Sequence, residues 1–189
     1  AFNPAFQRAE AFWELGLLED ARVEYEALRQ SVSADPADSF RLLPHLLVRG
    51  MYRSAILCSR QILDLAGFDD AGTLLAPMYF NHVRFGIYYQ DLVLESARIE
   101  NFHPLLLFSV MRQESLFDGI GRSSAGARGL MQIMPATGDE IASQLLWPPD
   151  YDAEDLYRPL VSITFGAHYL DRWRDYFDGD LLLALAAYN

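Results

Sequence analysis

The first thirty residues carry apolar side chains at helical spacing. Between Pro4 and Arg29 they recur every three to five positions, at Phe6, Ala9, Phe12 or Trp13, Leu17, Ala21, Tyr25 and Leu28. This spacing is typical of helix faces that pack together. Gly16 marks a tight connection inside the segment. The pattern therefore predicts two short antiparallel helices.

A second segment of the same kind extends from Leu46 to Leu65, with Gly50 and Met51 at the corresponding turn. The stretch between the two segments, residues 31–39, contains Pro36 and two aspartates and is predicted to be a loop. Helix pairs with a small residue at the turn resemble tetratricopeptide-like or related superhelical repeats. Only two units are visible and their period is not clean, so a generic helical bundle fits the pattern equally well.

Glycines and aspartates interrupt the helical pattern at residues 67–73, and Pro77 then predicts the start of a tyrosine-rich helix that runs towards Ala97. From His103 onward the apolar segments are long and none alternates with period two, so no strand is predicted. The sequence thus predicts an all-α protein. We expect a helical-repeat or helical-bundle region at residues 1–90 and a second helical domain at residues 91–189.

Composition narrows the classes of function. With 15 basic and 26 acidic side chains the formal net charge is −11, the opposite of what a nucleic-acid-binding protein carries. No run of about 18 apolar residues predicts a transmembrane segment, and residues 1–10 lack the layout of a secretory signal. The lone Cys58 lies among apolar residues and is expected to be a small buried hydrophobe. The four histidines are scattered, so we expect no metal and no other cofactor.

Glu114 is the acidic residue with the most unusual predicted surroundings. Pro104 suits the first turn of a helix, and His103 is then a capping or boundary residue. On that helix Leu106, Val110 and Phe117 fall to one side of Glu114, Leu107 and Met111 fall to the other, and Ser109 and Arg112 face solvent. A carboxyl group held among apolar side chains has a raised pKa and can serve as a general acid. The alternative is a glutamate whose stem packs while its head reaches solvent or a cation.

A connection rich in glycine and serine follows this helix. It contains Asp118, Gly119, Gly121, Ser123, Ser124, Gly126 and Gly129, and leads through Leu130 to Pro135. Such a loop lets a polymer approach the backbone closely, although the glycines could also be ordinary turn formers. Thr137 and Glu140 predict a capping box for the next helix.

Three short motifs occur in order along the second domain: Glu114-Ser115, then Gly129-Leu130-Met131-Gln132, then Ala187-Tyr188-Asn189. Together they resemble the motifs of the soluble lytic transglycosylase family, the lysozyme-like enzymes of bacterial murein turnover. The resemblance covers about residues 92–189 and implies a lysozyme-like α domain in the periplasm or elsewhere in the cell envelope. Gly119 and Ser162 depart from the family pattern, which has proline and asparagine there. The sequence ends at Asn189, before the segments that usually close the groove, so we expect the catalytic domain to be incomplete.

The resemblance also implies a role for each matching residue. Glu114 would protonate the glycosidic oxygen between N-acetylmuramic acid and N-acetylglucosamine and then act as the base. The expected sugar-binding residues are Ser123, Gln132, Met134 and Tyr188, with the Tyr188 hydroxyl near the acid. The expected supporting residues are Ser115, Gly129, Leu130, Met131 and Asn189.

One carboxyl group is enough for the reaction that this family carries out, whereas ordinary glycosidases use two. The resemblance implies that the N-acetyl oxygen of the muramic acid stabilises the cation-like centre and that its 6-hydroxyl attacks, giving a 1,6-anhydro product. Asp118 is the nearest second acid. Because it follows Glu114 by one turn of the same helix, it is poorly placed to reach the opposite face of a sugar, and we expect a helix-end or loop-capping role for it.

Two other functions fit the sequence. A hydrolase of goose-lysozyme type would share the fold but add water. A protein of a different class would be an envelope scaffold whose lysozyme-like half only holds glycan. In each case the expected partner is the glycan strand of peptidoglycan, and the N-terminal helices are a candidate docking region for envelope proteins.

Overall fold

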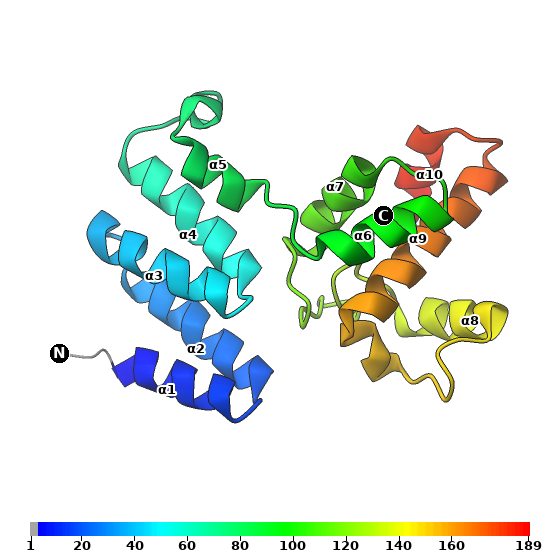
Figure 1. The fold of residues 1–189 in the computed structure, drawn as a ribbon, viewed down its shortest axis with the longest axis horizontal. Helices are drawn as coiled ribbons and strands as arrows, with labels where there is room; N and C mark the ends of the chain where they lie inside the picture. The colour runs from blue at the N-terminus through cyan, green and yellow to red at the C-terminus, as the bar shows by residue number, and fades with distance from the viewer. Residues whose placement is uncertain (1–3) are drawn as a thin grey trace. The chain divides into compact units, whose positions relative to one another are not determined.

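The structure is a computed structural model that describes residues 4–189. In that range the chain forms ten α-helices and two short 3-10 helices, and no strand (Figure 1). The prediction of an all-α protein is therefore confirmed. The chain divides into two compact units, one ending at Tyr88 and the other beginning at Tyr89. None of the helices in the described range is both long and apolar enough to span a bilayer.

The first unit contains two helix pairs followed by shorter elements. The pairs are α1 (Pro4–Glu14) with α2 (Leu18–Ser31) and α3 (Pro36–Val48) with α4 (Tyr52–Leu65); the shorter elements are η1 (Gly72–Leu75) and α5 (Met78–Arg84). Gly16 and Gly50 join the helices of each pair, with φ of +74° and +70°. Glycine adopts this left-handed conformation without steric cost, which explains why it ends a helix at both turns. The superhelical repeat itself stays a prediction.

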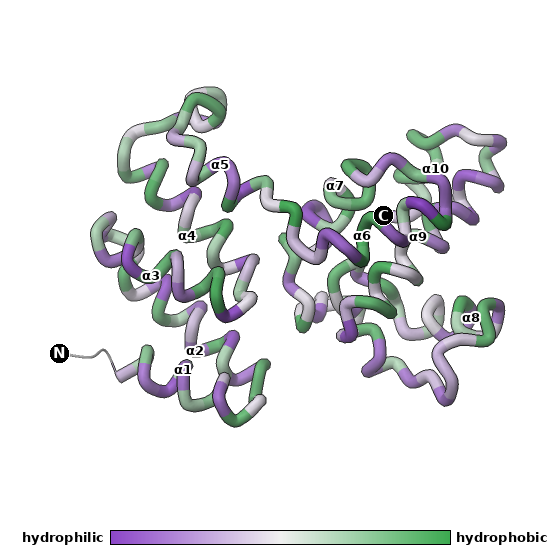
Figure 2. The backbone as a smooth tube through the Cα atoms, viewed as in Figure 1, coloured by the Kyte–Doolittle hydropathy of each residue, from purple (hydrophilic) through white to green (hydrophobic). Residues whose placement is uncertain are grey.

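Hydrophobic and hydrophilic positions alternate along each of these helices (Figure 2), and their buried residues form one core cluster. Ala9, Tyr25, Leu43 and Leu46 are among the fully buried residues of the unit. Cys58 is fully buried with them, and burial raises its pKa to about 11. It is therefore a protonated thiol at neutral pH, as expected for a small buried hydrophobe.

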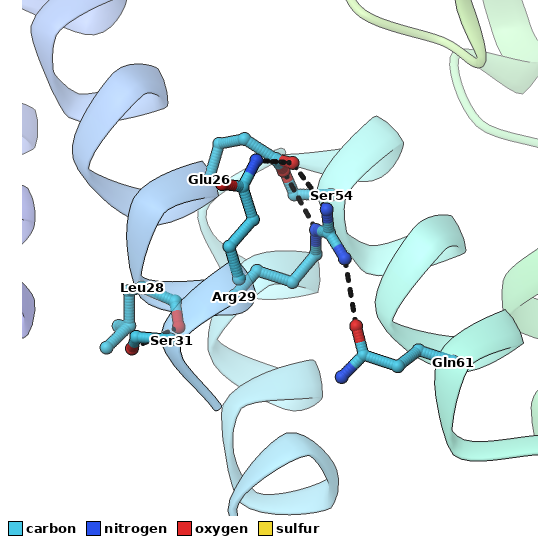
Figure 3. Close-up of polar contacts among 7 residues, drawn as sticks. Glu26, Leu28, Arg29, Ser31, Ser54 and Gln61 are labelled. Carbon is cyan, nitrogen blue, oxygen red and sulfur yellow. Dashed lines mark hydrogen bonds and ion pairs between the residues drawn. The ribbon is translucent and has the colours of Figure 1, made fainter. Parts of the chain in front are cut away.

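A polar cluster joins α2 to α4 (Figure 3). Arg29 forms an ion pair with Glu26 at 2.5 Å and donates a 2.9 Å hydrogen bond to Gln61. Ser54 donates a 3.0 Å hydrogen bond to the same glutamate. Burial acts to raise the pKa of Glu26, but the hydrogen bonds from Arg29, Gln30 and Ser54 outweigh it and leave that pKa below its usual value. The cluster thus stabilises the contact between the two helices through a charged carboxylate.

The second unit is arranged around its longest helix. Its elements are α6 (Gln90–Ile99), α7 (Pro104–Ser115), α8 (Pro135–Leu145), η2 (Ala153–Tyr157), α9 (Pro159–Tyr176) and α10 (Leu181–Tyr188). The helix α9 contacts α6, α8, α10 and η2, and α7 packs on α6. The core includes Leu107, Met111, Leu130, Met131, Phe165 and Leu170, all fully buried.

Three helix boundaries differ from the sequence predictions: the start of α3, the break between α5 and α6, and the start of α8. The loop expected at residues 31–39 is shorter, because α3 begins at Pro36 and the Asp35 carboxylate caps it through the Ala37 and Asp38 N–H groups. The helix expected from Pro77 towards Ala97 is in fact two helices, α5 and α6.

A turn built around Tyr88 separates these two helices. Its hydroxyl donates a 2.8 Å hydrogen bond to the Val83 carbonyl. A Cβ on Gly86 would lie only 2.6 Å from the Tyr88 ring, so the turn needs glycine at that position. The capping box predicted from Thr137 and Glu140 is also wrong. Helix α8 begins at Pro135 with Met134 at the N-cap position and no side-chain cap, because proline at the first helical position outweighs the local pattern.

Candidate active site

The helix that carries Glu114 begins as the sequence predicts. Pro104 occupies the first turn of α7, and the His103 Nδ1 atom caps it by accepting a 3.2 Å hydrogen bond from the Leu105 N–H. Leu107 and Met111 are fully buried on this helix. Glu114 lies in the last turn and is half-buried.

Two neighbours of Glu114 differ from the prediction. Phe117 is buried, but it lies beyond the end of α7 with φ of +62°, so the helical stripe does not place it. Arg112, predicted to face solvent, is half-buried, and burial lowers its pKa. Phe108, four positions before Arg112 and so on the same face of α7, is buried too, which shows that the buried surface of the helix extends beyond the predicted stripe.

A cavity of about 400 Å³ lies between α7 and α10. Its lining residues are Leu106, Ser109, Val110, Gln113, Glu114, Leu185, Tyr188 and Asn189. Glu114 is the one carboxyl group among these eight. Burial raises its pKa, so the carboxyl group stays protonated to higher pH than an exposed glutamate. A proton donor in a partly apolar cavity meets the first requirement for general acid catalysis.

Tyr188 forms the opposite wall of this cavity from α10. Its hydroxyl donates a 2.8 Å hydrogen bond to the Met131 carbonyl, and its ring packs against Tyr169 with the ring centres 5.4 Å apart. Burial, and next the Glu114 carboxylate, raise the pKa of Tyr188 well above its usual value. Tyr188 is therefore a neutral hydrogen-bond donor at neutral pH.

The segment Gly129 to Gln132 packs behind the cavity wall. Gly129 has φ of +73°, and a Cβ there would lie 2.0 Å from the Leu156 carbonyl oxygen, so only glycine fits. Ser115, next to Glu114, donates a 2.8 Å hydrogen bond to the Leu130 carbonyl. Gln132 also has positive φ, +50°, and its Nε2 donates to the carbonyls of Gly129 at 2.7 Å and Gly121 at 3.3 Å.

The structure brings three of the predicted site residues together at one cavity: Glu114, Tyr188 and Asn189. The other three sugar-binding candidates, Ser123, Gln132 and Met134, do not line it. Ser123 instead closes a turn, where its Oγ accepts a 3.0 Å hydrogen bond from the Ala127 N–H. Met134 is 42% exposed at the start of α8. Their roles stay predictions.

Five lining residues were not predicted as part of the site: Leu106, Ser109, Val110, Gln113 and Leu185. A signal for Leu185 was available, because it precedes Tyr188 by three positions and so lies on the same face of α10. Asp118 is buried and does not line the cavity, but it is not on the same helix as Glu114 as predicted, because α7 ends at Ser115 and Leu116 and Phe117 have positive φ. Between residues 4 and 189 no cluster of three histidine, cysteine or acidic side chains could hold a metal ion.

These features define an all-α domain with one acidic side chain at its cavity. Comparison with known proteins identifies the family. The model of the family described as "Transglycosylase SLT domain" matches residues 91–189, and the chain belongs to this family.

Two curated relatives are similar over part of the chain. The soluble lytic murein transglycosylase of Salmonella typhimurium is 32% identical over 117 residues, which cover 61% of this chain and 18% of the relative. A putative soluble lytic murein transglycosylase of Haemophilus influenzae is 36% identical over 111 residues, covering 53% and 18%. The chain therefore spans less than a fifth of the length of these relatives.

Two solved structures share the fold. An inactive mutant of the lytic transglycosylase Slt from Pseudomonas aeruginosa has a TM-score of 0.76 and 29% identity, over 98% of this chain and 28% of the other. A 70-kDa soluble lytic transglycosylase in complex with bulgecin A has a TM-score of 0.77 and 24% identity, over 99% of this chain and 28% of the other. Both likenesses extend over nearly the whole of this chain.

Proposed function

We propose that this chain is the part of a lytic transglycosylase that cleaves the β-1,4 bond between N-acetylmuramic acid and N-acetylglucosamine in peptidoglycan. The observation that carries the proposal is the place of Glu114, half-buried at a cavity with apolar walls that raises its pKa. Family membership and the names of the relatives support the substrate class. Glycan strands are the partner, and the cell envelope is the expected location.

In the proposed reaction Glu114 is first the acid and then the base. Its proton passes to the glycosidic oxygen as the bond from that oxygen to C1 of the muramic acid breaks. The N-acetyl oxygen of the same sugar stabilises the positive charge at C1. The 6-hydroxyl oxygen then bonds to C1, and its proton returns to the Glu114 carboxylate. The products are a free 4-hydroxyl group and a 1,6-anhydro end, and no water is consumed.

This mechanism needs no second carboxylate, and the lining of the cavity agrees with it. Asp118 is the nearest candidate in sequence, but it does not line the cavity. Tyr188 contributes a neutral hydroxyl on the wall opposite Glu114. Because it is not ionised, it adds no negative charge that would compete for the proton that the acid must deliver.

Gln132 is the proposed contact for an acetamido group of the glycan. Since both hydrogens of its Nε2 group point at backbone carbonyls, the orientation of the amide is fixed and its Oε1 is the atom left to accept a hydrogen bond. A glycan strand is longer than a cavity of about 400 Å³. The strand is therefore proposed to continue from the acid at the cavity towards Gln132 and Ser123.

The experiment is digestion of purified peptidoglycan by the wild-type chain and two variants, with mass spectrometry of the products. Glu114→Gln keeps the shape but cannot donate the proton, so turnover should fall at least about 100-fold while glycan binding remains. Asp118→Asn should retain turnover per folded molecule. Products with 1,6-anhydro ends support the proposal, whereas reducing ends indicate a hydrolase. Glycan binding without turnover in the wild type indicates a scaffold.

A further inference from the structure

Two helices hold Met131, the residue before Gln132, at the two ends of its backbone. Its N–H group donates a 3.1 Å hydrogen bond to Ser162 Oγ on α9. Its carbonyl accepts the 2.8 Å hydrogen bond from Tyr188 on α10. With Ser115 bonded to the Leu130 carbonyl, three consecutive backbone groups of this loop are held by side chains from three different helices.

We infer that Ser162 is a positioning residue, which fixes the loop that carries Gln132 and thereby sets the affinity for glycan. This inference rests on the proposed function. Ser162 lies outside the cavity that contains Glu114 and is fully buried, so it reaches substrate only through Met131 and Gln132.

The surface of α9 is shaped for this contact. Gly166 follows Ser162 by four positions, so both residues lie on the same face of the helix. A Cβ on Gly166 would lie 2.5 Å from the side chain of Met131, which shows how closely the loop approaches α9 at that point. Ser162 Oγ also lies 2.9 Å from where a Cβ on Gly129 would be. The absence of a side chain at position 166 therefore lets the loop approach α9, and the hydrogen bond to the hydroxyl at position 162 fixes the position of the Met131 backbone relative to this helix.

The hydroxyl matters because Gln132 has a backbone conformation that the loop must impose. A residue other than glycine at φ of +50° is held there by its surroundings. Gln132 itself is hydrogen-bonded to the carbonyls of Gly129 and Gly121. The bond that Ser162 accepts and the bond that Tyr188 donates add two restraints on the preceding residue, one on each side of the Met131 side chain. Without the acceptor at Ser162, the buried Met131 N–H group loses its partner, and the backbone of Met131 and Gln132 becomes less restricted.

Steady-state kinetics on soluble glycan strands tests this role in the whole chain. Ser162→Ala should raise KM by up to about tenfold, the upper value for one hydrogen bond, and should leave kcat and its pH profile unchanged because α7 is not altered. A purely structural role would lower the active fraction and hence kcat, with KM unchanged. Ser162→Thr keeps the hydroxyl and should restore KM. If Ser162→Ala does not fold, Ser162→Cys keeps the volume with a weaker acceptor and should raise KM in the same direction.

Two further measurements make the test specific. Amide hydrogen exchange at Met131 should become faster in Ser162→Ala and remain slow in Ser59→Ala, a matched control that loses a fully buried hydroxyl in the first unit. In a Gln132→Gly background, Ser162→Ala should add no further increase in KM, because its effect passes through Gln132. An unchanged KM together with unchanged exchange at Met131 overturns the inference.

The outcomes separate this inference from the proposed function. If the wild type cleaves peptidoglycan, Glu114→Gln does not, and Ser162→Ala equals the wild type, only the role of Ser162 fails. If neither the wild type nor Glu114→Gln cleaves peptidoglycan, the proposed function fails. The same variants are then compared by the affinity for glycan strands and by exchange at Met131, and unchanged values of both overturn the role of Ser162.

Discussion

The hydroxyl of Tyr188 donates a 2.8 Å hydrogen bond to the carbonyl of Met131, two residues that are 57 positions apart in the chain. This bond joins the last helix to the loop that precedes α8. Since Tyr188 also lines the cavity beside Glu114, one side chain connects the acid, the loop and α10. The Tyr188 phenol is therefore one of the groups that fix the relative position of these three parts, together with Ser115 and Ser162.

Tyr188→Phe keeps the ring and removes this bond. We expect a loss of about 1–3 kcal/mol in the free energy of unfolding, because the Met131 carbonyl is left without its partner. Tyr88→Phe is a matched control, since the Tyr88 hydroxyl also donates a 2.8 Å bond to a backbone carbonyl, that of Val83. Denaturant unfolding should show a similar loss for both variants, whereas glycan cleavage should fall only in Tyr188→Phe. Equal cleavage by both would contradict this role.

Gly129 and Gly126 form a second matched pair. Both have positive φ, +73° and +96°, but a Cβ at Gly129 would lie 2.0 Å from the Leu156 carbonyl oxygen and a Cβ at Gly126 would meet nothing within 4 Å. Gly126→Ala should cost about 1–2 kcal/mol of stability from backbone strain alone. Gly129→Ala should cost about 4 kcal/mol or more, because the backbone must also move. Thermal unfolding of the two variants measures the difference, and similar losses would show that the close approach to Leu156 is not what requires glycine.

The sequence predicted well those features that depend only on residues close together along one helix. The cap at His103, the first turn at Pro104 and the apolar surroundings of Glu114 follow from local spacing, and the structure has all three. Local spacing places Leu185 and Tyr188 on one face of α10, but which part of α7 that face meets depends on how α10 packs. The role of Ser162 was missed for the same reason, because its partner Met131 is distant in the chain.

Local rules failed where two of them competed. Thr137 and Glu140 have the spacing of a capping box, but Pro135 already fixes the start of α8. The tyrosine-rich stretch after Pro77 has helical spacing, yet Tyr88 folds back onto Val83 and Tyr89 adopts a left-handed conformation with φ of +60°. Non-glycine residues with positive φ, such as Gln132, carry no recognisable signal in a single sequence.

The polar cluster of the first unit should respond to acid. The pKa of Glu26 is lowered in the folded state, so its contribution to stability is present above the unfolded pKa of about 4.3 and is lost as pH falls through the folded value. At pH 7, Glu26→Gln should cost on the order of 1.5 kcal/mol, the lower end of the usual range for hydrogen bonds to a charged group, because the carboxylate is only half-buried. Hydrogen exchange at amides of α2 and α4 reports this loss for the first unit.

Glu19→Gln is the control for this prediction. Glu19 pairs with Arg22 at the same spacing on the same helix and at the same 2.5 Å distance, but its side chain is 60% exposed. We expect a smaller change at pH 7, because solvent screens an exposed pair. If the two variants lose equal stability, or if the loss in Glu26→Gln does not shrink as pH falls below about 4.3, the half-buried carboxylate is not what stabilises the contact between α2 and α4.

The effect of Glu114 on stability should depend on pH in the opposite direction from that of Glu26. Burial raises the pKa of Glu114, so its folded form favours the protonated state. Its contribution is therefore complete below about pH 4.3 and is lost as pH rises through the folded pKa, which makes the ionised group a cost to stability at neutral pH. Glu114→Gln cannot ionise, and its Tm at pH 7 should exceed that of the wild type, with no difference at low pH.

Glu95→Gln, which changes an exposed carboxylate paired with Arg98, should show no such gain. A Tm for Glu114→Gln equal to or below that of the wild type at pH 7 would mean that the cavity does not disfavour the charged carboxylate, and the case for Glu114 as a proton donor near neutral pH would then fail.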